Sequence, residues 1–493
     1  MHYVSTRNAS LRFKASEAIV RGISDDGGLF VPSIFPCLHK EEILKMFSMK
    51  YYERAAFVLS KFLVEFTYEE LCQYTKAAYG KFYGEPFPYT NVRDNINILE
   101  LWHGPTAAFK DAALALLPYL LVVSKKKINE KSKTLILVAT SGDTGKAALE
   151  GFKDVEDTNI IVLYPSTGVS SMQKLQMITQ EGDNVYVAAI EGNFDDAQSA
   201  VKEIFADTEL KLEFQKKGYK LSSANSINWG RLVPQIVYYV SSYVDLLKDK
   251  KINYGDFINV CVPTGNFGNI LAAYYAKKMG LPIDKFICAS NENNILTDFF
   301  NEGEYDANRV FHKTMSPSMD ILVSSNLERL LFEIFGRDDQ KVREKMNNLR
   351  NKKVYNITIE EKNIISKEFY GNFATENETL QTIYNYEKNY KYLLDTHTAV
   401  AVCVYEKYVD ATKDNKPVII ASTANPYKFP CDVYTGVTGK KEEDSFKAMI
   451  ELNKITNVEI PKPLQGLENK KVRFDKVYAN KAIKEVIKKY IEG

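Results

Sequence analysis

The residues FINVCVPTGNFGN, at positions 257–269, join an apolar, β-branched run to a turn with two glycines, and the helical run Ile270–Met279 follows at once. Gly265 and Gly268 let the backbone approach a ligand closely. The N–H groups of such a turn, with the dipole of the helix behind it, form a pocket for an anion. The spacing matches neither nucleotide loop, G-x-x-x-x-G-K-[ST] or G-x-G-x-x-G. Taken alone, it favours a turn that packs a strand on a helix over a binding site.

The same alternation of apolar strands and helices recurs from about residue 96. Such a pattern indicates an α/β protein with mostly parallel sheets that helices cover on both faces. The predicted strands are Thr134–Thr140, Ile160–Tyr164, Val185–Ile190, Phe257–Val262, Phe286–Ala289 and Val418–Ala421. We expect an N-terminal extension at 1–95, mainly helices and loops, a first α/β domain at 96–235, and a second at 236–493 with a mainly helical insertion at about 300–394.

Composition and charge favour a small-molecule partner. The 493 residues are 45% hydrophobic, and 64 Lys and Arg balance 63 Asp and Glu to a net charge of +1. This balance gives no global field for nucleic acid or anionic lipid, so we expect neither partner. The longest apolar run, Ala112–Val123, contains Pro118 and is shorter than the ~20 residues that a membrane helix needs. No signal or transit pattern is seen near Met1, which predicts a cytoplasmic location.

Cysteine and histidine spacing gives no support for a metal site. The six cysteines form no C-x-x-C pair, and none of the five histidines lies in an H-E-x-x-H motif. We therefore expect reduced, mostly buried thiols and no metal catalyst.

A second loop, VATSGDTGKAA at 138–148, also ends a strand and begins a helix. Thr140, Ser141 and Thr144 offer hydroxyl groups, and two glycines open the backbone. Ala147 stands where a magnesium-binding nucleotide loop needs Ser or Thr. Two interpretations remain equally good at this point, a cradle for a carboxylate or other anion and a helix N-cap.

A third loop, LWHGPTAAFKDAA at 101–113, places Lys110 among alanines and Phe109. Burial disfavours the charged amine, and lowering the pKa of a lysine from ~10.4 to about 7.5, as a nucleophilic lysine requires, takes roughly 4 kcal/mol. A lysine whose stem reaches solvent is much commoner, so the loop alone does not make Lys110 reactive.

Together, the three loops resemble loops of the pyridoxal-phosphate (PLP) enzymes of the tryptophan-synthase-beta fold. Their amino-acid sequences are similar to those of the threonine synthase family. HGPTAAFKD at 103–111 resembles the family's cofactor-lysine motif, TSGDTG at 140–145 its substrate loop, and GNFG at 265–268 its phosphate loop. Further matches are DGGLFVP at 26–32, GNFDDAQ at 192–198, NSINWGR at 225–231, SPSMDI at 316–321 and STANP at 422–426. The resemblance implies a type II PLP-enzyme fold, with two mostly parallel α/β halves around a PLP cleft.

The resemblance also implies roles for single residues. Lys110 is expected to bind the cofactor covalently and to move protons at carbons α and β of the substrate. Thr423 is expected to face the pyridine nitrogen, where a hydroxyl makes the ring a moderate electron sink. The cofactor phosphate is expected to be held by Gly265, Asn266, Phe267, Gly268 and Asn269.

The implied reaction converts O-phosphohomoserine and water to threonine and phosphate, the last step of threonine biosynthesis. Ser141, Asp143 and Thr144 are expected at the carboxylate end of the substrate or the cofactor hydroxyl. The leaving phosphate is expected to contact Ser226, Asn228 and Arg231, the last through its forked donors.

Three alternatives stay open. The first two are enzymes of the same fold, a phosphohomoserine lyase that releases 2-oxobutyrate and a serine or threonine dehydratase. The third is a relative that keeps the cofactor only as a structural or sensing ligand, which the intact Lys110 disfavours. The chain departs from the family pattern at Asn294, Thr396 and Asn425, none of which removes a group that the cofactor chemistry requires. Either a monomer or a homodimer is compatible with the sequence.

Overall fold

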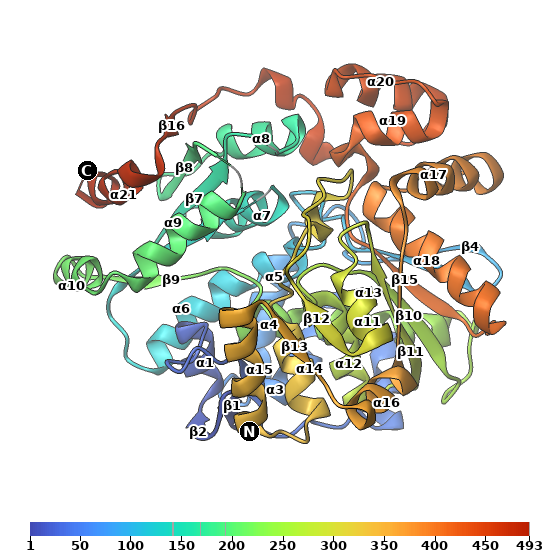
Figure 1. Ribbon diagram of the computed structural model, residues 1–493, viewed down its shortest axis with the longest axis horizontal. Coiled ribbons are helices and arrows are strands. Elements are labelled where there is room, and N and C mark those ends of the chain that lie inside the picture. The colour runs from blue at the N-terminus through green and yellow to red at the C-terminus, as the bar shows by residue number, and fades with distance from the viewer. Residues whose placement is uncertain (141, 168, 193, 493) are drawn as a thin grey trace.

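Two largely parallel β-sheets form the framework of the computed structural model, which describes residues 1–140, 142–167, 169–192 and 194–492 (Figure 1). The larger sheet has six strands, and neighbours are parallel except β4 and β5. In spatial order they are β14 (Phe369–Phe373), β11 (Ile283–Ser290), β10 (Ile258–Pro263), β15 (Val418–Ser422), β5 (Ile96–Glu100) and β4 (Tyr89–Arg93).

The second sheet has five strands, and every neighbouring pair in it is parallel. In spatial order they are β16 (Val477–Tyr478), β8 (Val185–Ile190), β7 (Thr158–Pro165), β6 (Lys133–Ala139) and β9 (Tyr219–Ser222). All six strands predicted from apolar runs are present with small shifts at their ends, and the prediction of two mostly parallel α/β halves is confirmed.

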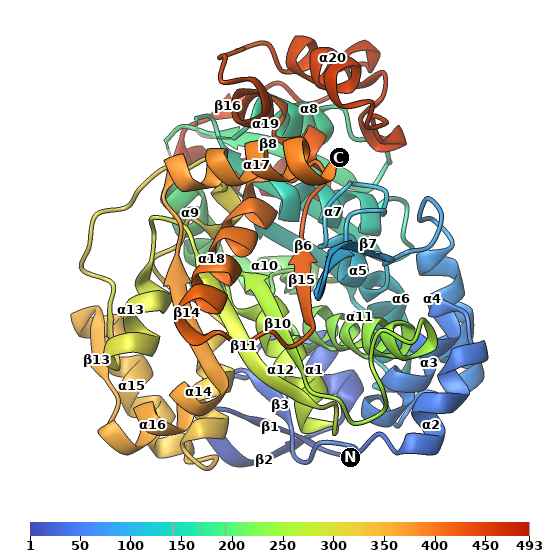
Figure 2. The ribbon, with the colours of Figure 1, turned by 90° about the vertical axis from the view of Figure 1, so that its right-hand side faces the viewer.

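Helices cover both sheets. Those around the five-stranded sheet are α7 (Asp143–Phe152), α8 (Ser171–Ile178), α9 (Phe194–Ala206), α10 (Thr208–Lys216) and α21 (Ile483–Glu492). The other helices of these two halves include α5 (Asp111–Leu114), α6 (Leu117–Lys127), α11 (Trp229–Lys248), α12 (Gly268–Lys278), α13 (Ile295–Glu302) and α18 (Thr396–Thr412). Of these, α12, α13 and α18 pack directly on strands of the six-stranded sheet. Figure 2 shows α18 beside β14 and β11, with which it packs.

Helix α11 lies in the middle of the molecule and packs against α12, α5 and the N-terminal helix α3 (Tyr51–Phe62). Its sequence is apolar on nearly every side, which is typical of a helix buried all round. The Asn228 side chain caps its first turn by accepting from the N–H of Gly230. Pro234 lies inside the helix, where it has no N–H to donate to the carbonyl of Gly230 one turn earlier.

The N-terminal part contains α1 (Ala15–Arg21), α2 (Lys40–Lys45), α3 and α4 (Tyr68–Tyr79), and also a three-stranded antiparallel sheet that the sequence did not predict. Its strands are β1 (Tyr3–Ser5), β2 (Asn8–Phe13) and β3 (Phe30–Pro32), in the order β2-β1-β3. Strands of three residues are too short to show alternation, and β2 has no buried residue, so neither signal was available.

The part from 300 to 394 is mostly helical but adds β14 to the edge of the six-stranded sheet. Its other elements are β12 (Glu304–Asp306), β13 (Val354–Asn356), α14 (Leu327–Ile334), α15 (Asp339–Lys352), α16 (Ile359–Glu368) and α17 (Glu376–Tyr390). Helices α19 (Pro430–Thr438) and α20 (Ser445–Thr456) follow β15. Because β5 pairs with β15 far along the chain, and the late strand β16 joins the five-stranded sheet, the two sheets interleave in sequence. Domain boundaries near 95 and 235 remain a proposal.

Within the described ranges, no helix combines the length and the apolarity that crossing a bilayer requires.

Candidate functional site

The three loops singled out in the sequence all begin where a parallel strand ends. They follow β5, β6 and β10, and a fourth segment with Thr423 follows β15. The carboxyl ends of parallel strands are where α/β proteins bind ligands. The N–H of Phe109 donates to the carbonyl of Thr423 over 2.8 Å, and Ala108 and Ala424 form a β-bridge. The loop with Lys110 is therefore fixed directly against the segment with Thr423.

Asp111 gives the loop before Lys110 its shape. Its carboxylate turns back and accepts the N–H of Thr106 at 2.8 Å and the hydroxyl of Thr106 at 2.6 Å. Ala107 takes a left-handed conformation with φ of 58°, which is unusual for alanine. A side chain at Gly104 would meet the Asp111 carboxylate at 2.4 Å, so glycine is needed there. Burial raises the pKa of Asp111 to about 6, although its two bonds with Thr106 oppose the rise.

The amine of Lys110 lies in an almost closed environment. Its side chain is 11% exposed, and Nζ is 3.3 Å from the Ser318 hydroxyl and 3.8 Å from Asp143 Oδ2. Burial lowers the pKa of Lys110 to about 8, Asp143 opposes this, and the positive charges of Arg231 and Lys428 add to it. Above that pH the amine is neutral and has a lone pair for nucleophilic attack or proton abstraction.

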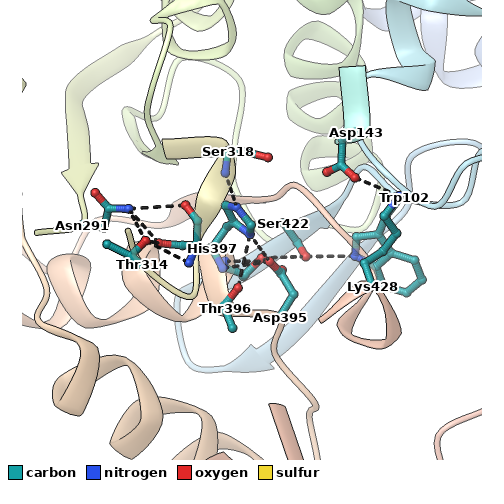
Figure 3. A network of polar contacts seen from close by, with 12 residues as sticks. Trp102, Asp143, Asn291, Thr314, Ser318, Asp395, Thr396, His397, Ser422 and Lys428 are labelled. Carbon is teal, nitrogen blue, oxygen red and sulfur yellow. Dashed lines mark hydrogen bonds and ion pairs between the residues drawn. The ribbon is translucent and has the colours of Figure 1, made fainter. Parts of the chain in front are cut away.

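Asp143 lies at the first position of α7, between two lysines. Its Oδ1 accepts from Lys428 Nζ at 2.8 Å and from the amide of Gln173 at 2.8 Å, and Figure 3 shows the pair with Lys428. Burial works to raise the pKa of Asp143, but the charges of Lys428 and Lys110 outweigh it and hold the pKa below its usual range. Asp143 is therefore ionised at every pH at which the protein is expected to work.

The loop from 265 to 269 joins β10 to α12 at the same end of the sheet. Phe267 is left-handed, with φ of 63°, which turns the chain sharply into the helix. The first N–H groups of α12 have no acceptor within the helix and suit an anion. The side-chain oxygen of Asn269 accepts from the Tyr238 hydroxyl at 2.8 Å, whereas its buried side-chain nitrogen has no partner among the described residues. The loop thus combines free backbone donors with an unsatisfied side-chain donor.

We expect Gly265→Ala to lower the free energy of unfolding of the cofactor-free protein by about 1–3 kcal/mol, because the added methyl group would be packed too tightly against the backbone of Ser318. A side chain at Gly265 would meet the Ser318 carbonyl at 2.7 Å. Urea unfolding measures the effect. Gly268→Ala is the matched control, since its nearest contact would lie at an ordinary 3.6 Å. Equal stability of the two variants would show that the loop is not tightly packed against Ser318.

Arg231 lies in the first turn of α11 and is 3% exposed. One of its terminal nitrogens donates to the carbonyl of Ala224, and its buried Nε has no hydrogen-bond partner in the part of the chain that the structure describes. Within the described ranges it forms no ion pair with a carboxylate. Burial lowers its pKa to about 10. A buried guanidinium without a counter-ion marks a place where an anion would be strongly bound.

The other residues predicted to contact the substrate differ in their burial and in the hydrogen bonds that they already make. The half-buried Ser226 hydroxyl accepts from Asn326 at 3.3 Å. Both ends of the Asn228 amide are already used, one to cap α11 and one to donate to the Ile19 carbonyl at 3.0 Å. Thr144 lies half-buried in the first turn of α7. Ser141 lies outside the described residues.

Sequence reasoning missed several polar residues that face Lys110 or Asp143. Lys428 contacts Asp143, and the Ser318 hydroxyl contacts the Lys110 amine. A ring nitrogen of His397 accepts the backbone N–H of Ser318 at 3.1 Å (Figure 3). His397 is in turn 3.1 Å from Asp395. Ser318 was within a quoted motif, and Lys428 follows another by two residues as an isolated charge between Tyr427 and Phe429. That isolated charge was an available signal. Among the described residues, no group of three His, Cys, Asp or Glu side chains could hold a metal ion.

Three family models match successive parts of the chain. They are described as "Threonine synthase N terminus" for residues 2–79, "Pyridoxal-phosphate dependent enzyme" for 90–423, and "Threonine synthase, C-terminal" for 398–491.

Relatives match along most of the chain. Threonine synthase of Saccharomyces cerevisiae is 36% identical over 99% of this chain and 98% of its own length. The human protein "Threonine synthase-like 1" is 42% identical over 84% of this chain but only 56% of its own length, so the match spans little more than half of that relative. Among solved structures, PLP-bound threonine synthase from Brucella melitensis has a TM-score of 0.88 and 36% identity, with 100% of both chains covered.

Proposed function

Because this chain belongs to the threonine synthase family of pyridoxal-phosphate dependent enzymes, we propose that it converts O-phospho-L-homoserine and water to L-threonine and phosphate. The observation that carries the proposal is the buried Arg231, which has no carboxylate partner among the described residues and lies near enough to Lys110 to lower its pKa. The phosphate of an amino-acid phosphate ester would supply the anion that Arg231 lacks, with the carbons of the substrate near the Lys110 amine.

The residues present fit pyridoxal 5′-phosphate. Lys110 supplies an amine that loses its proton at about pH 8, as attachment to an aldehyde requires. The turn from Gly265 to Asn269 supplies free N–H groups and an unpartnered amide nitrogen for the phosphate. Thr423 is fixed beside the Lys110 loop, with a hydroxyl instead of a carboxylate for the pyridine nitrogen. When bound, the cofactor supplies an electron sink for negative charge at carbon α of the substrate.

Lys110 is proposed to move the protons of the reaction. Its neutral amine takes the proton from carbon α, and it must give that proton up before it can take one from carbon β. The protonated form returns a proton to carbon α at the end. The Ser318 hydroxyl at 3.3 Å and the Asp143 carboxylate at 3.8 Å are placed to stabilise the ammonium form. The almost closed environment of the amine limits access of bulk water to these steps.

Two anionic groups of the substrate need two sets of donors. We assign the phosphate to Arg231, by its forked geometry, and to the Ser226 hydroxyl, with Asn228 holding the first turn of α11 in place. For the carboxylate we propose Ser141, Thr144 and the N-terminus of α7. Asp143 is itself an anion, so its proposed contacts are the Lys110 amine and the cofactor hydroxyl.

Substrate selection tests this proposal against the dehydratase alternative. The cofactor-loaded protein is offered O-phosphohomoserine, homoserine, serine and threonine at equal concentrations, and amino acids, 2-oxoacids and phosphate are measured. We expect turnover of O-phosphohomoserine and at least a 100-fold lower rate with homoserine, because an unfilled Arg231 forfeits charge-assisted bonds of ~1.5–3 kcal/mol each. Formation of 2-oxoacids from serine or threonine at a comparable rate would contradict the proposal.

We further propose a cytoplasmic location and either a monomer or a homodimer. The near-neutral charge and the six cysteines, all free, support a reducing compartment. Size-exclusion chromatography with light scattering distinguishes the two assembly states.

A further inference from the structure

Lys428 is a fully buried lysine that contacts one carboxylate oxygen of Asp143, while Lys110 lies nearer the other oxygen. It ends the short 3₁₀ turn η3 (Pro426–Lys428), and its side chain is 0% exposed. Nζ is 2.8 Å from Asp143 Oδ1, 2.7 Å from the Gln176 side-chain oxygen and 3.1 Å from the Thr106 carbonyl. Figure 3 shows Lys428 pointing toward Asp143.

These three acceptors match the three N–H bonds of an ammonium group. A buried charge is costly unless it is paired and its hydrogen bonds are satisfied, and here both conditions are met. The acceptors come from α7, from α8 and from the loop before Lys110. Lys428 therefore joins three segments of the site through one charged group.

The Asp143 carboxylate divides its two oxygens between the two lysines. Oδ1 takes the short contact with Lys428 at 2.8 Å and the amide of Gln173 at 2.8 Å, whereas Oδ2 lies 3.8 Å from Lys110. The tight ion pair is thus with Lys428, and the contact with Lys110 is a loose one. Without Lys428, the nearest cation left for this buried carboxylate is Lys110.

We propose that Lys428 is a positioning residue, which anchors the Asp143 carboxylate and so keeps Lys110 from being locked in an ion pair as an ammonium group. This inference rests on the proposed role of Lys110 as the reactive amine. It gives the second buried lysine a purpose, because a structural role alone would not require a charge beside the reactive amine.

The expected direction follows from the charges that face Lys110. Asp111 on α5 and Asp143 on α7 raise its pKa, whereas Arg231 on α11 and Lys428 on η3 lower it. In Lys428→Met one positive charge is lost, and the carboxylate of Asp143 is free to turn fully to Lys110. Both effects favour the protonated amine, so the pKa of Lys110 is expected to rise.

The test measures the Lys110 amine directly in the cofactor-free protein, without substrate. The protein is treated briefly with acetic anhydride between pH 6 and 11, and acetylation of the Lys110 peptide is quantified by mass spectrometry. In the unchanged protein the rate should rise with an inflection near pH 8. In Lys428→Met the inflection should move upward by about one pH unit or more, since a freed carboxylate within ~4–6 Å has an effect of that size.

Lys146→Met is the matched control. Lys146 is also buried, at 11% exposure, and is paired with Glu150 at 2.9 Å one turn further along α7. We expect its loss to leave the Lys110 inflection in place. Lys428→Arg, which restores the charge, should return the inflection most of the way to that of the unchanged protein.

An inflection that stays in place or moves downward in Lys428→Met would overturn the inference. If Lys428→Met does not fold by circular dichroism, Lys428→Gln replaces it, because glutamine removes the charge but can still donate to Asp143. The upward shift is then expected from the lost charge alone. Because no substrate is used, this result is independent of whether threonine is the product.

Discussion

Lys110→Ala is expected to lower the rate of phosphate release from O-phosphohomoserine by about 10⁴-fold or more, because we propose that this one side chain supplies both the cofactor attachment and the proton transfers. Its amine is nearly closed off from solvent, with a pKa of about 8, and the amine of Lys428, which also contacts Asp143, is held by three acceptors. No neighbouring group among the described residues is placed to take over. The measurement is the steady-state rate with saturating cofactor, together with the cofactor retained after gel filtration.

The matched control is Lys125→Ala. Lys125 is also a buried lysine, 6% exposed, but lies on α6. Its loss should leave the rate within a factor of about two, since changes away from the site act mainly on stability. A Lys110→Ala rate within tenfold of the unchanged protein would remove Lys110 from the chemistry.

Arg231→Met is expected to have opposite effects on activity and stability. The kcat/KM for O-phosphohomoserine should fall by about 100-fold or more, because each charge-assisted bond to the phosphate contributes ~1.5–3 kcal/mol. The free energy of unfolding of the cofactor-free protein should rise by about 1–3 kcal/mol, because a buried charge that has no counter-ion among the described residues is replaced by an apolar side chain of similar length. Kinetics and urea unfolding of the same preparation measure both.

Arg329→Met provides the contrast. Arg329 is 0% exposed, and burial lowers its pKa to about 10 as it does for Arg231, but its donors are used. They reach the carbonyls of Phe30 at 3.0 Å and Ile227 at 2.6 Å and the side-chain oxygen of Asn326. Its loss should lower the free energy of unfolding by about 3 kcal/mol, because three buried acceptors lose their donor. Destabilisation of Arg231→Met to the same extent would mean that Arg231 is a structural residue.

Much of the fold could be predicted because its signals are local. The buried strands β6, β7, β8 and β10 are continuous apolar runs, as expected for parallel strands covered on both faces. The turns after them contain glycines that the structure uses, above all Gly265 against the Ser318 carbonyl. The strands β1 and β3 have three residues each, which is too short for such a pattern, and they become strands by pairing within the N-terminal sheet.

The missed site residues depend on contacts between distant parts of the chain. Lys428 bonds to Gln176 and to Thr106, which are 252 and 322 positions away. Nothing near residue 428 indicates those partners. Asn228 does carry a local signal, because an asparagine before a long apolar helix is typical of an N-cap, and the structure uses its side chain in that way. Its contact with the substrate stays a prediction.

The central claim is that this chain makes threonine from O-phosphohomoserine, and a product balance tests it most directly. The cofactor-loaded protein is given O-phosphohomoserine, and phosphate, threonine and 2-oxobutyrate are quantified in one sample over time. We predict one threonine for each phosphate, with no 2-oxobutyrate above that formed by Lys110→Ala. Phosphate matched by 2-oxobutyrate would contradict the claim and make the protein a lyase on the same fold, and no phosphate at all would mean that the substrate is wrong.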